Sequence, residues 1–105
     1  MAYYQGARRK VFLLTYSGLL FQKFLTDFLD TRPEALHWFG ILPSTILIVS
    51  RSDAVTLGNL IHAQFPHVRF VITEVDPRKT SGWINQQVWD FINNPQSSGR
   101  WEPPG

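Results

Sequence analysis

The sequence contains no cysteine, and only 17% of its residues are charged. Without cysteine there is no disulfide, no catalytic thiolate and no cysteine-ligated zinc or iron–sulfur site. This absence fits a reducing compartment, and we expect a cytoplasmic protein. Ten Lys and Arg residues against eight Asp and Glu residues give a formal net charge of +2. So small an excess does not predict a uniformly basic surface, although it leaves room for a local phosphate site.

Several functional motifs are missing as well. No apolar run approaches the ~20 residues that span a bilayer, and residues 1–10 lack the order of a secretory signal, so we expect no membrane partner. Neither a glycine-rich nucleotide loop nor a Gly-x-Ser-x-Gly nucleophile elbow occurs. The histidines, His37, His62 and His67, lack metal-ligand spacing. The sequence therefore predicts no catalytic residue, no cofactor and no metal site.

One apolar stretch, residues 11–16, dominates the first half of the chain. It shows almost no alternation of apolar and polar residues, which is typical of a strand covered on both faces. Residues 45–49 and 68–75 are similar. We expect residues 11–16 to form the middle of a sheet.

Amphipathic patterns separate these stretches and predict three helices. The first is expected to be capped by Ser17 and to bury Leu20, Phe21, Phe24, Leu25, Phe28 and Leu29. The second, capped at residues 52–53 and running through Phe65, is expected to bury Val55, Leu57, Leu60, Ile61 and Phe65. The last follows residue 82 and is expected to use Trp83, Ile84, Val88, Trp89 and Ile92 for packing.

Residues 35–41 and 45–49 are joined by a short link that contains Pro43, which favours an antiparallel hairpin. The order β-α-β-β-α-β with an added C-terminal helix predicts an α+β ferredoxin-like sandwich whose first and third strands are central. A small Rossmann-like α/β layer is the alternative if residues 35–41 form a loop. We expect one domain over residues 10–94, a flexible arm over 1–9 and a flexible tail over 95–105.

The pattern of residues 10–76 resembles a known superfamily. Its elements are a strand just inside the N-terminus, a helix, the stretch Leu-Pro-Ser-Thr-Ile-Leu-Ile-Val-Ser, a helix that begins Ser-Asp-Ala, and the strand Phe-Val-Ile-Thr-Glu-Val. This pattern is similar to that of the small CRISPR-associated adaptation nucleases and virulence-associated protein D toxins. The resemblance implies a ferredoxin-like homodimer, in some members cutting RNA or DNA with an Asp at the end of the first strand. Here residues 15–18 read Thr-Tyr-Ser-Gly, without an acid.

Residues 78–82 are the best candidate for a binding site. The loop offers two cations, two hydroxyls and a glycine before a helix, where free N–H groups and the helix dipole favour an anion. The anion or phosphate site predicted here consists of Arg78, Lys79, Thr80, Ser81 and Gly82. Asp27 and Asp30 fit an ordinary solvated helix face, while Trp101 in the tail has no structural role that the sequence assigns.

These observations leave three functions open. The first is a non-catalytic or catalytically degenerate dimeric domain that binds nucleic acid or a protein. The second is a small metal-dependent endonuclease or toxin, for which Asp53 or Asp76 would have to lie near the end of the first strand. The third is a regulatory domain that binds a phosphate-bearing small molecule.

Overall fold

Four antiparallel strands form one sheet in the order β2-β3-β1-β4. Their bounds are β1 Lys10–Tyr16, β2 His37–Leu42, β3 Thr45–Ser50 and β4 Phe70–Glu74. The computed structural model describes residues 8–17, 20, 22–84 and 86–94. The expected tail with Trp101, and all but the last two residues of the expected arm, lie outside the described residues.

The prediction that the first and third strands are central is confirmed. β1 pairs with β3 on one side, where Leu13 lies opposite Leu47, and with β4 on the other. The hairpin of β2 and β3 is present, and residues 43–44 form its turn. Because all three pairings are antiparallel, the alternative α/β layer with its parallel sheet is wrong.

Both faces of the sheet carry a hydrophobic core. Strand alternation sends Phe12 and Leu14 to one face and Val11 and Leu13 to the other. The first face packs with the buried residues Tyr16, Leu20, Leu25, Leu29, Ala35, Ile46, Ile48, Leu57 and Ile61. The second packs with the buried residues Leu47, Val49, Val88 and Ile92. The unbroken apolar pattern of residues 11–16 therefore has its expected cause, a strand covered from both sides.

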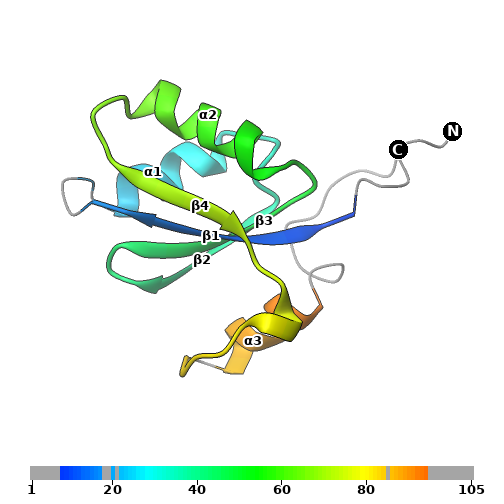
Figure 1. The fold of residues 1–105 in the computed structure, drawn as a ribbon. Coiled ribbons are helices and arrows are strands. Elements are labelled where there is room, and N and C mark those ends of the chain that lie inside the picture. Colours follow the sequence, from blue (N-terminus) through cyan, green and yellow to red (C-terminus); the bar gives the residue numbers. More distant parts are fainter. Residues whose placement is uncertain (1–7, 18–19, 21, 85, 95–105) are drawn as a thin grey trace, which may run out of the picture.

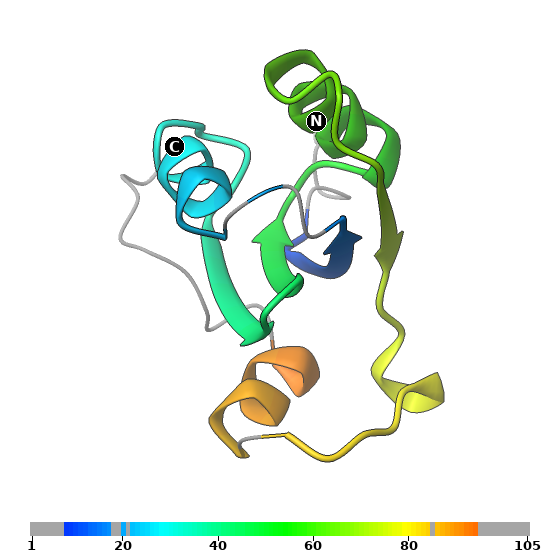
Figure 2. The ribbon, with the colours of Figure 1, turned by 90° about the vertical axis from the view of Figure 1, so that its left-hand side faces the viewer.

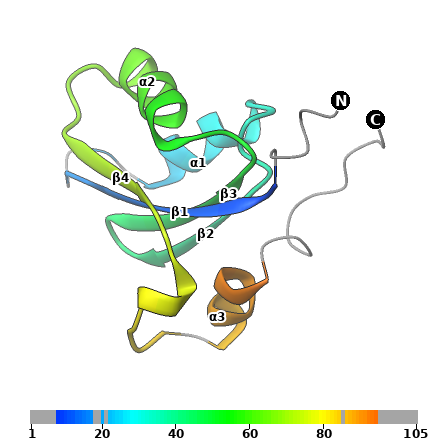
Figure 3. The ribbon, with the colours of Figure 1, turned by 45° about the vertical axis from the view of Figure 1, so that its right-hand side comes forward.

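Helices α1 (Gln22–Asp30) and α2 (Ala54–Gln64) cover the first face, and α3 (Gln86–Asn93) covers part of the second. Figure 1 shows the green and cyan helices on one side of the sheet and the orange helix on the other. Figures 2 and 3 show the same arrangement from two other directions, with α1 and α2 on one side of the sheet and α3 on the other. The structure is thus α+β, with a four-stranded antiparallel sheet and three α-helices among the described residues.

Two features of the predicted helices are wrong. Ser17 does not cap α1: the N–H of Leu20 donates to the Ser17 carbonyl in a preceding turn, and α1 begins at Gln22. Phe24 and Val55, expected in the core, are 59% and 73% exposed. Helical positions one residue apart differ by about 100° and those two apart by about 200°, so helices that place Leu25 and Leu57 against the sheet turn Phe24 and Val55 toward solvent. Phe21 lies outside the described residues.

The predicted start of α3 is also wrong. Residues 80–84 are irregular, and the helix is described from Gln86. Trp83 is 100% exposed, whereas Val88 and Ile92 are buried as expected. The chain leaves β4 at the sheet edge and reaches the middle of the second face before it turns into α3 (Figure 1), so the intervening residues are a connection and not a first helical turn.

Candidate basic site at one end of the sheet

One end of the sheet gathers cations from three separate segments. Lys10 at the start of β1 pairs with Ser50 at the end of β3, and Phe12 pairs with Glu74 at the end of β4. The residues that flank these strand ends are therefore neighbours. Six of the ten Lys and Arg residues flank them, namely Arg8, Arg9, Lys10, Arg51, Arg78 and Lys79. The acids in the same segments are Asp53, Glu74 and Asp76.

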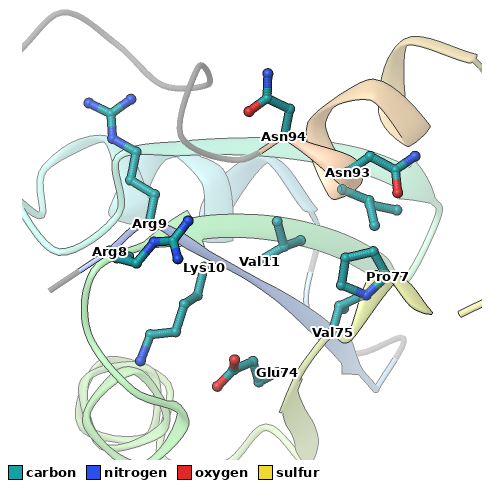
Figure 4. A pocket seen from close by; sticks show the side chains of 10 residues that line it. Arg8, Arg9, Lys10, Val11, Glu74, Val75, Pro77, Asn93 and Asn94 are labelled. Atoms are coloured by element: carbon teal, nitrogen blue, oxygen red, sulfur yellow. The ribbon is translucent and has the colours of Figure 1, made fainter. Parts of the chain in front are cut away.

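Residues 8–10 line a surface hollow of about 350 Å³ between the start of β1 and the end of α3. Its other lining residues are Val11, Glu74, Val75, Pro77, Ile92, Asn93 and Asn94. Figure 4 shows Arg9 and Asn94 pointing to one side of β1, and Lys10 and Glu74 to the other. The cations thus present charge on both sides of a single strand. We call residues 8–10 with Asn93 and Asn94 the basic site.

Backbone pairing fixes the shape of this site. The Val75 N–H donates to the Val11 carbonyl at 2.8 Å, which extends the pairing of β1 and β4 beyond Glu74. Burial of Val11 and Ile92 in the second core holds the end of α3 against the start of β1. The C-terminal end of a helix carries partial negative charge, so it favours cations beside it. This end of α3 therefore favours positive charge at the start of β1.

An aromatic ring and a carboxylate lie on the same side of β1 as the Lys10 side chain. Its ammonium lies 6.0 Å from the centroid of the Phe12 ring, and Glu74 extends from the paired strand on the same side. The pKa of the Asp53 carboxyl is lowered chiefly by the N–H of Thr56, with a smaller contribution from the charge of Lys10. Among the described lining residues there are three cations and one carboxylate, that of Glu74, and the side chains of Lys10 and Glu74 point to the side of β1 opposite Arg9 and Asn94.

The predicted anion loop, residues 78–82, lies near this end but differs from the expected geometry. Pro77–Lys79 form the short 3-10 helix η2, and Asp76 caps it by accepting from the Arg78 N–H at 3.0 Å. The Arg78 guanidinium also bonds Asp76, with 3.2 Å between Nη2 and Oδ2, and this pairing lowers the pKa of the Asp76 carboxyl. Arg78 is therefore partly neutralised by its own loop.

The remaining residues of that loop do not converge on a helix N-terminus. The Thr80 hydroxyl donates to the Asp76 carbonyl at 2.6 Å, and Ser81 and Gly82 are exposed. The helix α3 is described only from Gln86, so its N-terminal N–H groups do not lie at Gly82, where they were expected to bind the anion. An anion site at residues 78–82 stays a prediction, and Lys79 is its most available cation.

The other candidate acids have ordinary structural partners. Asp27 pairs with Lys23 one helical turn away, at 3.1 Å. Asp30 accepts a hydrogen bond from the Trp38 indole Nε1 at 2.8 Å, which ties α1 to β2. His62 is exposed on α2.

The two acids on which the nuclease hypothesis depends lie at the wrong end of β1 within one chain. Asp53 follows β3 and Asp76 follows β4, so both lie near Lys10, whereas Ser17 is at the opposite end. Across the described residues, no three His, Asp or Glu side chains gather in a group that could hold a metal ion. In the same part of the chain, no helix has the length and apolarity needed to cross a bilayer.

Comparison of the chain with protein-family models, with curated proteins and with solved structures gives no match.

The basic site was not predicted from the sequence. Three successive cations at residues 8–10 were visible as the beginning of the first strand. Their proximity to residues 93–94 depends on where α3 docks, which the sequence pattern does not specify.

Proposed function

We propose that this chain is a non-catalytic ferredoxin-like domain that binds nucleic acid through its phosphates at the basic site. The strand order with β1 and β3 in the centre, and two helices on one face, supports the ferredoxin-like assignment. The supporting observation for function is the gathering of Arg8, Arg9 and Lys10 around one hollow beside two amide side chains.

Nucleic acid fits this site better than a protein partner. Arg, Lys and Asn side chains are common donors to phosphate oxygens. The exposed apolar side chains that would favour a protein, such as Val71 and Trp83, lie outside the lining of the hollow. Among the described residues, the lining contains no aromatic ring on which a base could stack, so contacts to phosphate predict binding with little sequence preference.

The test is fluorescence anisotropy of a labelled single-stranded oligonucleotide titrated with the protein. The variant Arg8→Ala is expected to weaken binding severalfold, because Arg8 is exposed and lines the hollow. The matched control is Arg69→Ala, an exposed arginine that precedes β4 at the opposite end of the sheet. Equal losses in both variants would mean that net charge alone governs binding, and would contradict a localised site.

We also propose that the domain forms a homodimer. Helix α3 covers the second face of the sheet only in part, and Val71, paired with Thr15 on that face, is 63% exposed. Burial of a large apolar side chain is favourable by ~1.5–3 kcal/mol, so an uncovered stretch of this face favours a second copy. Dimerisation is independent of the basic site and has its own test below.

A further inference from the structure

A second cavity, of about 450 Å³, lies between the second face of the sheet and the segment that contains α3. Leu13, Ile41 and Leu47 contribute to it from three strands, and Ile84 and Trp89 contribute from the side of α3. An eight-residue helix is ~12 Å long and ~10 Å wide, so it covers about two strands of a four-stranded sheet. The cavity exists because α3 is too small to cover the whole face.

The size and lining of this cavity suit a small organic ligand. Ligand pockets commonly enclose ~300–1,000 Å³, with apolar walls and a few polar groups that orient the ligand. The polar groups here come from one side, where Thr73 and Glu74 end β4 and residues 76–81 follow it. A ligand would therefore place its apolar part on the sheet and its polar group toward residues 76–81.

The charges on that side favour an anionic group. Asp76 is paired with Arg78 at 3.2 Å, which offsets its negative charge. The side chain of Glu74 lies on the other face of the sheet with its partner Phe12, as its direction in Figure 4 confirms. Lys79 lines the cavity and has no ion-pair partner among the described residues. Its ammonium is the charge left to recognise a ligand.

We propose that this cavity binds a small amphipathic carboxylic acid. Its apolar body lies between Leu13, Ile41 and Trp89, and its carboxylate contacts the Lys79 ammonium. This inference does not depend on nucleic-acid binding, since Lys79 does not line the basic site and residues 8–10 do not line this cavity.

The probe is decanoate below its micellar concentration, measured by titration calorimetry and by the indole N–H signals in a two-dimensional NMR spectrum. We expect saturable binding with one site per chain and a shift of the Trp89 signal. Lys79→Gln is expected to raise the decanoate Kd by roughly tenfold, as loss of a charge-assisted hydrogen bond predicts. The matched control Lys23→Gln, on α1 and outside the cavity, is expected to leave the Kd unchanged.

Two further comparisons separate recognition of the carboxylate from adsorption to apolar surface. The uncharged 1-decanol is expected to bind the wild type and Lys79→Gln equally. Ile41→Trp fills part of the cavity with a larger side chain. It is expected to abolish decanoate binding and to leave oligonucleotide binding intact. Absence of saturable binding, an unchanged Kd in Lys79→Gln, or full binding by the Ile41→Trp variant would each overturn the proposal.

Discussion

At the residue scale, the amide of Gln22 connects the first helix to the hairpin. Its Nε2 donates to the Leu42 carbonyl and to the Tyr16 hydroxyl, both at 2.9 Å. Gly40 leaves the space that this side chain occupies, because a Cβ at residue 40 would collide with the Gln22 amide. Glycine is thus favoured at position 40 by the neighbouring Gln22 side chain and not by its own backbone conformation.

This contact predicts a measurable coupling. Gly40→Ala should displace the Gln22 amide and lower the free energy of unfolding by about 1–2 kcal/mol, the range for one or two lost hydrogen bonds. In a Gln22→Ala background the same change should cost much less. Urea denaturation of the four proteins in this cycle measures the coupling. Additive effects would show that the Gln22 amide does not limit residue 40.

Asp53 gives a second prediction, which concerns pH. Its Oδ1 accepts from the Thr56 N–H at 2.7 Å as the N-cap of α2, and this bond lowers the pKa of the carboxyl. A carboxyl with a lowered folded-state pKa stabilises the fold above its ordinary pKa, and the effect is lost as the pH falls through the folded-state pKa. Asp53→Asn keeps the cap but does not titrate.

We therefore expect the melting temperature of the wild type to exceed that of Asp53→Asn at pH 7, and the difference to shrink below about pH 4. Asp53→Ala should melt lower than both at pH 7, by roughly 5 °C relative to the wild type, because it lacks a cap. Thermal melts followed by circular dichroism at pH 7 and pH 3 provide the measurement. A wild-type advantage that is as large at pH 3 as at pH 7 would contradict the assigned role of the carboxylate.

At the element scale, the sheet was more predictable than the helices. The continuous apolar run of residues 11–16 indicates a strand buried on both faces, and β1 is such a strand. Ser52 and Asp53 predict the start of α2 because N-cap positions favour a small set of polar residues. Each of these signals depends on residues close together in the chain.

Helical stripes were less informative. The spacing of Trp83 and Ile84 with later apolar residues matches a helical period, but the chain uses them to cross from the sheet edge to α3. The basic site was unpredictable for a related reason: its members come from both ends of the described chain and meet only through β1 pairing and α3 docking. Periodicity within one segment does not indicate which residues from distant segments become neighbours in the fold.

Docking of α3 is expected to contribute strongly to stability. Ile92 is 3% exposed and packs with Val11, Leu47 and Val49. Ile92→Ala should lower the free energy of unfolding by about 2–4 kcal/mol, through lost burial and the cavity left behind. Val55→Ala on the exposed side of α2 is the control, with an expected change within ~0.5 kcal/mol. Equal effects in urea denaturation would mean that α3 does not pack as described.

At the scale of the whole molecule, the partly covered second face predicts association. Light scattering at micromolar concentration should give twice the chain mass of 12.1 kDa. Val71→Lys should shift the protein toward the monomer, because it places a charge on the exposed part of that face. Val55→Lys, on α2, should leave the dimer intact. A wild-type mass of one chain would contradict the proposed dimer.

The distribution of charge is the molecule's main functional feature in this account. A net charge of +2 suggests little affinity for nucleic acid when it is averaged over the surface. The antiparallel topology instead places six of the ten cations beside one end of the sheet. Nucleic-acid binding should therefore depend on the cations at this end of the sheet, even though the total charge of the chain is small.

The salt dependence of oligonucleotide binding tests this claim most directly. Contacts to phosphates of a single strand change the slope of log K against log salt concentration by ~0.7 for each phosphate neutralised. Replacing Arg8, Arg9 and Lys10 together with Gln should therefore reduce the magnitude of the slope by about 2 and weaken binding at low salt. A triple variant with the wild-type slope and affinity would contradict binding at the basic site.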